Sequence, residues 1–252
     1  NSTLDSSAKS KTQNDSSIMK KTFSYSFMVV LLLISLISCS NKRSNTPRVL
    51  VFSKTADFHH SSIPAGIKAI QALGAKNGFE VDTTTDDNKF AEDSLKKYAA
   101  LIFLSTTGNI LNGNQENALE RYIQAGGGFV GIHAATDAEY DWGWYGRMIG
   151  AYFVNHPAQQ EANLIINDKK HPATDSLPDT WRRKDEWYNF RFVNKDLKVL
   201  ISIDEKSYTG GKNGDAHPMS WYHEFDGGRV FYTELGHTDE SYSDPLYLKH
   251  IL

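Results

Sequence analysis

Three histidines stand just after three separate apolar runs of the sequence. His60 comes after RVLVFS and a short polar loop, His133 directly ends GFVGI, and His237 follows RVFYTEL. Imidazole titrates near neutral pH, so each of these side chains could act as an acid or a base. A neutral ring nitrogen also binds zinc and similar divalent ions. No HExxH or CxxC pattern is present, so the spacing leaves proton transfer and metal binding both open.

Two carboxylates join this set of candidates. Glu186 lies in the stretch RRKDEWYNF, directly before Trp187. Aromatic neighbours can raise the pKa of a carboxyl group and make it a general acid or base. A surface carboxylate beside core aromatics is an equally simple interpretation. Asp137 follows His133 in the same segment, and we predict that it contacts a substrate.

Aromatic and histidine side chains between residues 140 and 232 suit the faces of sugar rings, although they suit an ordinary core as well. We predict substrate-binding roles for His60, Asp137, Trp144, Trp187, His217 and Trp221. In the stretch HPMSWYHEF, alternate positions share one face of a strand only if no β-bulge intervenes. The NHP and KHP segments around His156 and His171 are interpreted as turns.

The elements that must position these side chains alternate along the first half of the chain. Apolar runs predict strands over residues 48–53, 79–85, 100–105 and 128–133, and helical spacing predicts helices from Ser62 and over residues 114–127. Strands that alternate with helices form a parallel sheet covered on both faces. Ligands bind at the carboxyl ends of such strands, which is where the three histidines fall.

The pattern changes after Trp144. Residues 161–168 and 198–204 are predicted strands, and residues 217–225 and 229–235 are predicted to form a hairpin around DGG. A last helix is predicted from Pro245 onward. The fold class is therefore α/β, a flavodoxin-like three-layer sandwich with a mostly parallel sheet and a mixed-strand extension.

The sequence before residue 48 has a different character. Residues 1–18 are polar and form a predicted leader, and residues 19–38 combine lysines with a short apolar core typical of a signal peptide. Cys39, in LISCS, resembles the lipidated cysteine of a bacterial lipoprotein, although a chance cysteine is the simpler alternative. Residues 39–47 are then a tether, and residues 48–252 form one domain. We expect a location in the cell envelope, facing the periplasm or at the outer membrane, with membrane contact through the lipid alone.

Composition excludes several classes of protein. The net charge of −3 gives no basic excess for nucleic acid. With one cysteine in the chain, no internal disulfide can form and no thiol remains in the domain for catalysis. Residues 126–128 are glycines that fit the end of a helix and the start of a strand rather than a phosphate-binding loop. The chain stops inside a predicted helix, which is consistent with a truncated C-terminus.

Four stretches, in order, resemble the trehalose-utilisation (ThuA-like) family: FSKTADFHHSSIPAGIKAI, GGGFVGIHAATDAEYDWGWYGRMIGAYFVNHP, HPATDSLPDTWRRKDEWYNF and HPMSWYHEFDGGRVFYTELGHT. The family looks like a variant of the class I glutamine amidotransferase fold, in which the turn after the equivalent strand carries a nucleophile, usually cysteine. Here that turn carries His133, at what we expect to be a strained, exposed elbow. Amidotransferase chemistry through a thioester is therefore excluded.

The resemblance implies carbohydrate metabolism, particularly of trehalose-like disaccharides and their 3-keto forms. It also matches His60, His133, Glu186 and His237 to functional positions of the family. The first hypothesis is a hydrolase or lyase of keto-glycosides, with His133 or His237 as base, Glu186 as acid and His60 as a substrate or metal contact.

The expected cofactor is a divalent metal such as zinc, held by His60, His133 and His237. No dinucleotide fingerprint is present, so any oxidation of the sugar needs a partner sugar oxidoreductase. Two alternatives remain open: a non-catalytic sugar-binding lipoprotein, and a structural subunit of a neighbouring sugar enzyme.

Overall fold

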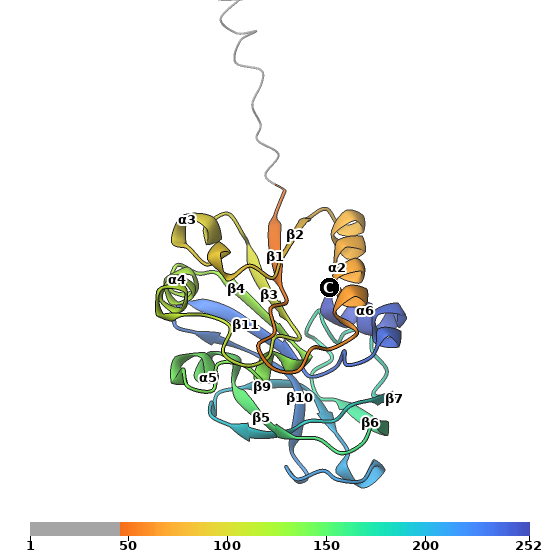
Figure 1. The fold of residues 1–252 in the computed structure, drawn as a ribbon. Coiled ribbons are helices and arrows are strands. Elements are labelled where there is room, and N and C mark those ends of the chain that lie inside the picture. Colours follow the sequence, from red (N-terminus) through yellow and green to blue (C-terminus); the bar gives the residue numbers. More distant parts are fainter. Residues whose placement is uncertain (1–45) are drawn as a thin grey trace, which may run out of the picture. The chain divides into compact units, whose positions relative to one another are not determined.

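A computed structural model describes residues 46–252, and the predicted leader, signal peptide, Cys39 and most of the tether lie outside this range. Residues 46–252 form one compact unit built on a nine-stranded sheet (Figure 1). Its strand order is β2-β1-β3-β4-β11-β10-β9-β6-β7. Within the described part, no helix combines the length and the hydropathy needed to cross a membrane.

The sheet has a parallel half and an antiparallel half. The parallel strands are β2 (Glu80–Thr84), β1 (Arg48–Phe52), β3 (Ala100–Leu104), β4 (Gly128–Ile132) and β11 (Gly228–Thr233). The antiparallel strands are β10 (His217–Phe225), β9 (Lys198–Ile203), β6 (Gln160–Ile166) and β7 (Thr180–Asp185). This arrangement confirms the predicted α/β class with a mixed extension.

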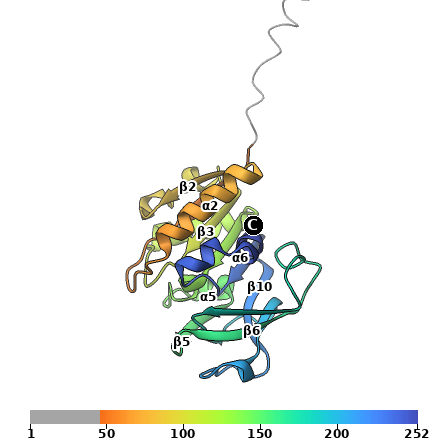
Figure 2. The same cartoon turned by 90° about the vertical axis from the view of Figure 1, so that its right-hand side faces the viewer.

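Helices cover both faces of the parallel half, as Figures 1 and 2 show. Helices α2 (Ile63–Asn77) and α6 (Pro245–Ile251) lie on one face, and α3 (Glu92–Leu95), α4 (Gly113–Gln124) and α5 (Gly143–Ile149) lie on the other. Four 3-10 segments connect the elements: η1 (Asp87–Lys89), η2 (His133–Thr136), η3 (Glu205–Ser207) and η4 (Asp239–Ser243). A separate two-stranded sheet pairs β5 (Ala151–Asn155) with β8 (Asn189–Phe192).

The hairpin of β10 and β11 forms as predicted. Asp226 and Gly227 adopt φ values of 46° and 96° in its turn, and positive φ at both central residues is the geometry that matches the twist of a hairpin. The pairing of β10 with β9 shifts register around Ser220, so a bulge interrupts the alternation.

Several elements were not predicted because their sequences lack a clean period. β7 carries the polar run TWRRKD, and its burial alternates only in part. β5 and β8 are short and pair with each other outside the main sheet. Two of these strands matter for function because of the residues that follow them: His156 follows β5 and Glu186 follows β7.

Candidate metal and catalytic centre

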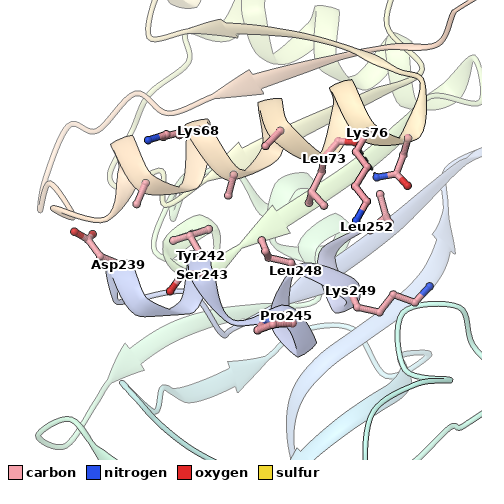
Figure 3. Close-up of a pocket in the computed structure, with 14 residues that line it drawn as sticks. Lys68, Leu73, Lys76, Asp239, Tyr242, Ser243, Pro245, Leu248, Lys249 and Leu252 are labelled. Carbon is pink, nitrogen blue, oxygen red and sulfur yellow. Dashed lines mark hydrogen bonds between the residues drawn. The ribbon is translucent and has the colours of Figure 1, made fainter.

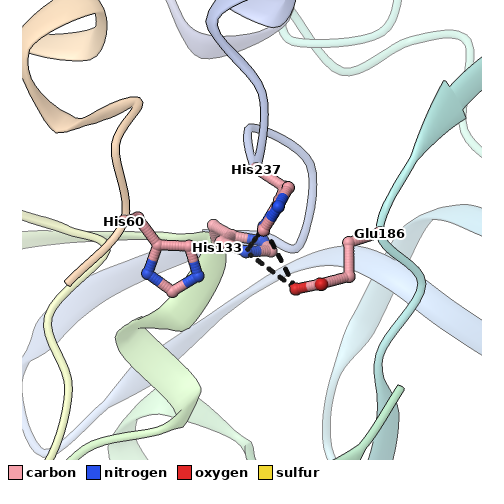
Figure 4. Close-up of side chains that lie close together, drawn as sticks. All are labelled: His60, His133, Glu186 and His237. Atoms are coloured by element: carbon pink, nitrogen blue, oxygen red, sulfur yellow. Dashed lines mark hydrogen bonds and ion pairs between the residues drawn. The ribbon is translucent and has the colours of Figure 1, made fainter. Parts of the chain in front are cut away.

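Four side chains from four separate chain segments converge at the carboxyl edge of the sheet. His60, His133, Glu186 and His237 each offer one ligand atom, and these atoms all lie within 4.8 Å of one another. Figure 4 shows that His60 comes from the loop before α2, His133 from the end of β4, His237 from the loop after β11 and Glu186 from the end of β7. The three histidines predicted to share one rim are therefore brought together.

His133 occupies a strained elbow. Its φ is 52°, a left-handed value that is uncommon for a residue with a side chain. Two residues earlier in β4, Gly131 packs closely, because an added Cβ would come within 3.0 Å of Ile149 and Tyr232. The expected strain is confirmed, but the expectation that the elbow is exposed was wrong. The His133 side chain is 0% exposed, because the loops of His60, Glu186 and His237 cover it.

The hydrogen bonds of His133 fix which ring nitrogen carries the proton. Nδ1 lies 2.7 Å from the backbone carbonyl oxygen of Glu234, and a carbonyl only accepts, so Nδ1–H donates. The Nε2 lone pair therefore faces the cluster, 3.1 Å from the Tyr188 hydroxyl and 3.1 Å from Nδ1 of His237. A ring held by a backbone carbonyl through one nitrogen, with the other free, is the usual state of a metal-binding histidine.

Three of the donor atoms already have the spacing of metal ligands. His133 Nε2 lies 3.5 Å and His237 Nδ1 lies 3.1 Å from Oε2 of Glu186, and the two nitrogens are 3.1 Å apart. Ligands about 2.0 Å from a tetrahedral zinc ion are about 3.3 Å from one another. The three atoms could therefore hold a divalent ion with little movement.

His60 supplies the fourth potential ligand. Its ring is 3% exposed and packs edge-on against His133 and His237, with ring centroids 4.7 and 5.2 Å apart. Burial, together with repulsion from the other two imidazoles, lowers the pKa of His60 to about 3, so the ring is neutral near pH 7. Nδ1 of His60 is buried without a hydrogen-bond partner, and a neutral imidazole is the form that binds metal.

The pKa of Glu186 is shifted in the opposite direction from the one expected. Burial beside aromatic side chains would raise its pKa, but hydrogen bonds and charge interactions with His133 and His237 outweigh burial and lower it. The carboxylate is therefore ionised near neutral pH, and the expected role as general acid is not supported. For His237, burial opposes the charged form, and the interaction with Glu186 prevails and raises the pKa.

Two residues of the centre were missed by sequence reasoning. His156, interpreted as a turn residue, places Nδ1 3.1 Å from Oε1 of Glu186, with its side chain 40% exposed. Tyr188 directs its buried hydroxyl at Nε2 of His133. Both residues lie in stretches that resemble the family. Neither follows a strand that the sequence predicted, so nothing singled them out.

Asp137 lies beside the centre, while Trp144 lies at the other end of β11. The Asp137 carboxylate accepts a hydrogen bond from the Tyr140 hydroxyl at 2.7 Å, and burial raises its pKa. The indole N–H of Trp144 instead donates to Asp226, in the turn that precedes β11, whereas His237 follows that strand. Asp137 interacts with the centre through its charge, which acts on His133 and His156, whereas Trp144 lies away from it.

The remaining predicted binding residues belong to the core. Trp187, His217 and Trp221 are each 0% exposed. The two indoles donate to the backbone carbonyls of Gln160 and Ile149. His217 instead bridges Glu205 and the carbonyl of Tyr188. A fully buried ring has no face for a sugar, so these three residues belong to the core and do not line a sugar-binding surface.

The structure also contains a separate groove that carries no comparable chemistry. It measures about 620 Å³ between α2 and the η4–α6 segment (Figure 3). Its walls are mainly small apolar side chains such as Ala69, Leu73 and Leu248, with lysines at the rim. No cluster of histidines and carboxylates faces it among its lining residues, so the four-residue centre remains the candidate site.

Comparison with known proteins places this architecture in a family. Residues 48–252 match the family ThuA, described as trehalose utilisation, and the chain belongs to this family. A ThuA-like protein from Bacteroides uniformis is 25% identical, with a TM-score of 0.70 over 84% of this chain and 91% of that one. One from Parabacteroides merdae is 22% identical, with a TM-score of 0.64 over 76% and 80%.

More distant structures share the fold alone. A β-galactosidase from Bacillus circulans is 13% identical, with a TM-score of 0.55 over 82% of this chain but only 30% of its own. No curated protein matches the chain. Membership of the trehalose-utilisation family supports a role connected with carbohydrates.

Proposed function

We propose that this protein is a hydrolase or lyase of trehalose-like or 3-keto-disaccharides, with a divalent ion such as zinc held by His60, His133, Glu186 and His237. The observation that carries the proposal is the convergence of these four donors within 4.8 Å. Nδ1 of His60 is buried with no hydrogen-bond partner, and burial of such a group is costly unless a ligand satisfies it.

The protein's own side chains prepare this centre before any substrate arrives. The backbone carbonyl of Glu234 fixes the ring of His133, and His156 holds one oxygen of Glu186 so that the other faces His133 and His237. When bound, the ion would act as a Lewis acid toward a carbonyl oxygen of the sugar. With four side chains engaged as ligands, proton transfer falls to a neighbouring group.

We assign the proton transfer to Asp137. Its pKa is raised, chiefly by burial, and a carboxylate with a raised pKa is a better base near neutral pH. In a sugar oxidised at C3, the ketone acidifies the C2–H bond. Asp137 takes that proton, the electron pair of the bond forms a C1=C2 double bond, and the C1–O bond to the leaving sugar breaks. The leaving oxygen takes a proton from water. The hydroxide so formed adds to C1 and Asp137 returns its proton to C2, which completes hydrolysis and restores the base.

The proposal includes a partner and a location. The sugar must arrive already oxidised, because the sequence carries no dinucleotide fingerprint, so a sugar oxidoreductase supplies the substrate. Cys39 anchors the protein to the cell envelope through a lipid. Metabolic labelling with a radioactive fatty acid tests the anchor: the wild type should be labelled and Cys39→Ser should not, and equal labelling would reject it.

Turnover of 3-keto-trehalose, followed by NMR, tests the reaction. The wild type should release glucose, Asp137→Asn should be slower by at least about 100-fold, and His237→Ala should be inactive while remaining folded. Tyr222→Phe, a change at a tyrosine of β10 outside the centre, is the control and should keep full activity. Saturable sugar binding without any product, under every metal tested, would reject the enzyme and favour a binding protein.

A further inference from the structure

A fully buried carboxylate connects two of the segments that build the centre. Asp185, the last residue of β7, is 0% exposed. Its Oδ1 accepts the backbone N–H groups of Glu186 at 3.0 Å and His237 at 3.2 Å, and its Oδ2 accepts the N–H of Gly236 at 3.2 Å. One side chain thus holds the backbone of two of the four donor residues.

The sheet alone does not fix the distance between these two residues. Glu186 follows β7, at the far edge of the antiparallel half, whereas His237 follows β11, and β10, β9 and β6 separate the two strands in the sheet order. No strand ladder therefore joins their ends directly. The Asp185 carboxylate, next to Glu186 in the chain, spans this gap with two hydrogen bonds, from the N–H groups of Gly236 and His237. Its side chain is not one of the four donors.

The charge of Asp185 is balanced inside the protein. Nη2 of Arg183 lies 2.9 Å from Oδ2 of Asp185 and 2.7 Å from the Ser241 hydroxyl oxygen, with the Arg183 side chain 8% exposed. The guanidinium packs over the rings of Trp181 and Tyr247 at 4.7 and 5.2 Å. Only Nη2 of Arg183 is hydrogen-bonded, while its buried Nε and Nη1 have no hydrogen-bond partner. Loss of one member of a buried ion pair leaves the other charge uncompensated.

We propose that Asp185 is a positioning residue that sets the separation of Glu186 and His237, and so tunes the affinity and geometry of the metal centre. The proposal rests on the proposed function for its effect on metal. Its structural part, the clamp on two backbone segments, stands on the hydrogen bonds alone.

The test compares Asp185→Asn with a matched control in the full-length protein. The amide keeps the shape but removes the charge and one acceptor, so zinc affinity should fall by about 10- to 100-fold. The visible spectrum of the cobalt-substituted protein should change as the ligands move. Asp244 also faces Arg183, at 3.6 Å, and caps α6 through the N–H of Leu246. Asp244→Asn keeps a capping residue and should leave both readouts unchanged.

Amide hydrogen exchange makes the test independent of metal. The Gly236 and His237 amides should exchange faster in Asp185→Asn than in the wild type, whether or not an ion is bound. If Asp185→Asn does not fold, Arg183→Lys should still weaken the clamp and speed exchange at the same two amides by a smaller factor.

Unchanged exchange in a folded Asp185→Asn or Arg183→Lys variant would overturn the proposal. If the wild type binds no zinc but Asp185→Asn still exchanges faster than the wild type, the clamp is supported and the metal centre is rejected. Faster exchange with unaltered zinc affinity and cobalt spectrum would overturn the tuning role.

Discussion

Nδ1 of His133 donates to the backbone carbonyl of Glu234 at 2.7 Å, so the residue at the strained elbow presents its other nitrogen to His237 and Glu186. The turn after β4 therefore carries an imidazole that is already oriented toward the other side chains of the centre. The orientation is a property of the backbone and does not depend on the protonation state of the neighbouring side chains.

The first prediction concerns this tautomer. Because a carbonyl oxygen only accepts, His133 should carry its proton on Nδ1 at neutral pH. Nitrogen-15 NMR of the imidazole side chains should show a protonated Nδ1 for His133, as for His156 and His250, which also face backbone carbonyls. Zinc should shift the Nε2 signal of His133. A proton on Nε2 of His133 would contradict the assigned hydrogen bond.

The second prediction concerns Glu186. Glu186→Gln keeps the size of the side chain but removes the charge that faces two histidines. Zinc affinity should fall by at least about 10-fold, as measured by competition with a chelator. Glu240→Gln, at an exposed glutamate of η4, is the control. Equal zinc affinity in the two variants would mean that Glu186 is not a metal ligand.

The third prediction concerns Gly236, directly before His237. Its φ is 116°, and an added Cβ would lie 2.4 Å from the Tyr247 hydroxyl oxygen. Gly236→Ala should therefore destabilise the protein by strain and by clash. Gly214 has a φ of 78° with nothing within 4 Å of an added Cβ, so Gly214→Ala isolates the strain, about 1 kcal/mol. Similar urea midpoints for both variants would contradict this prediction, because they would mean that the loop before His237 relaxes enough to avoid the clash.

The fourth prediction concerns pH. Burial of His250 lowers its pKa from 6.5 to about 4, and its nitrogens lie 2.9 Å from the Ala173 carbonyl and 3.1 Å from the Thr233 hydroxyl. Between these pH values the unfolded chain binds a proton that the folded protein does not. Stability should therefore be full above pH 6.5 and decrease toward pH 4, by about 3 kcal/mol from this residue.

The control for the pH prediction is a pair of variants. His250→Gln removes the titrating group, so its melting temperature should fall less between pH 7 and pH 4.5 than that of the wild type. His59→Gln, at an exposed histidine, should keep the wild-type dependence. The same fall in all three proteins would mean that His250 is not responsible.

The sequence alone was sufficient to predict the parallel half of the fold and the meeting of three histidines. His60, His133 and His237 follow apolar runs, and the carboxyl ends of parallel strands necessarily share one edge. The aromatic neighbours of Glu186 made it a candidate, with a surface carboxylate as an equal alternative, and the family resemblance then favoured function. Its place at the site could not be predicted, because it follows β7, a polar edge strand without periodicity. Its distance from β11 in the sheet gave no reason to expect contact with His237.

The failures have a common physical origin. Residue type alone does not say whether a side chain is buried or faces solvent. The residue types of a sugar site are present in Trp187, His217 and Trp221, but all three are buried. His156 was overlooked for the opposite reason: a half-exposed turn residue gains its role only from the carboxylate that tertiary structure places 3.1 Å away.

The most direct test of this account is metal analysis of the protein, purified without chelator, beside His133→Ala and His237→Ala. The account predicts close to one divalent ion per wild-type chain and almost none in either variant, with circular dichroism showing that all three proteins are folded. Wild-type protein that neither contains metal nor binds added zinc would contradict it, and would leave the four side chains as a hydrogen-bonded cluster.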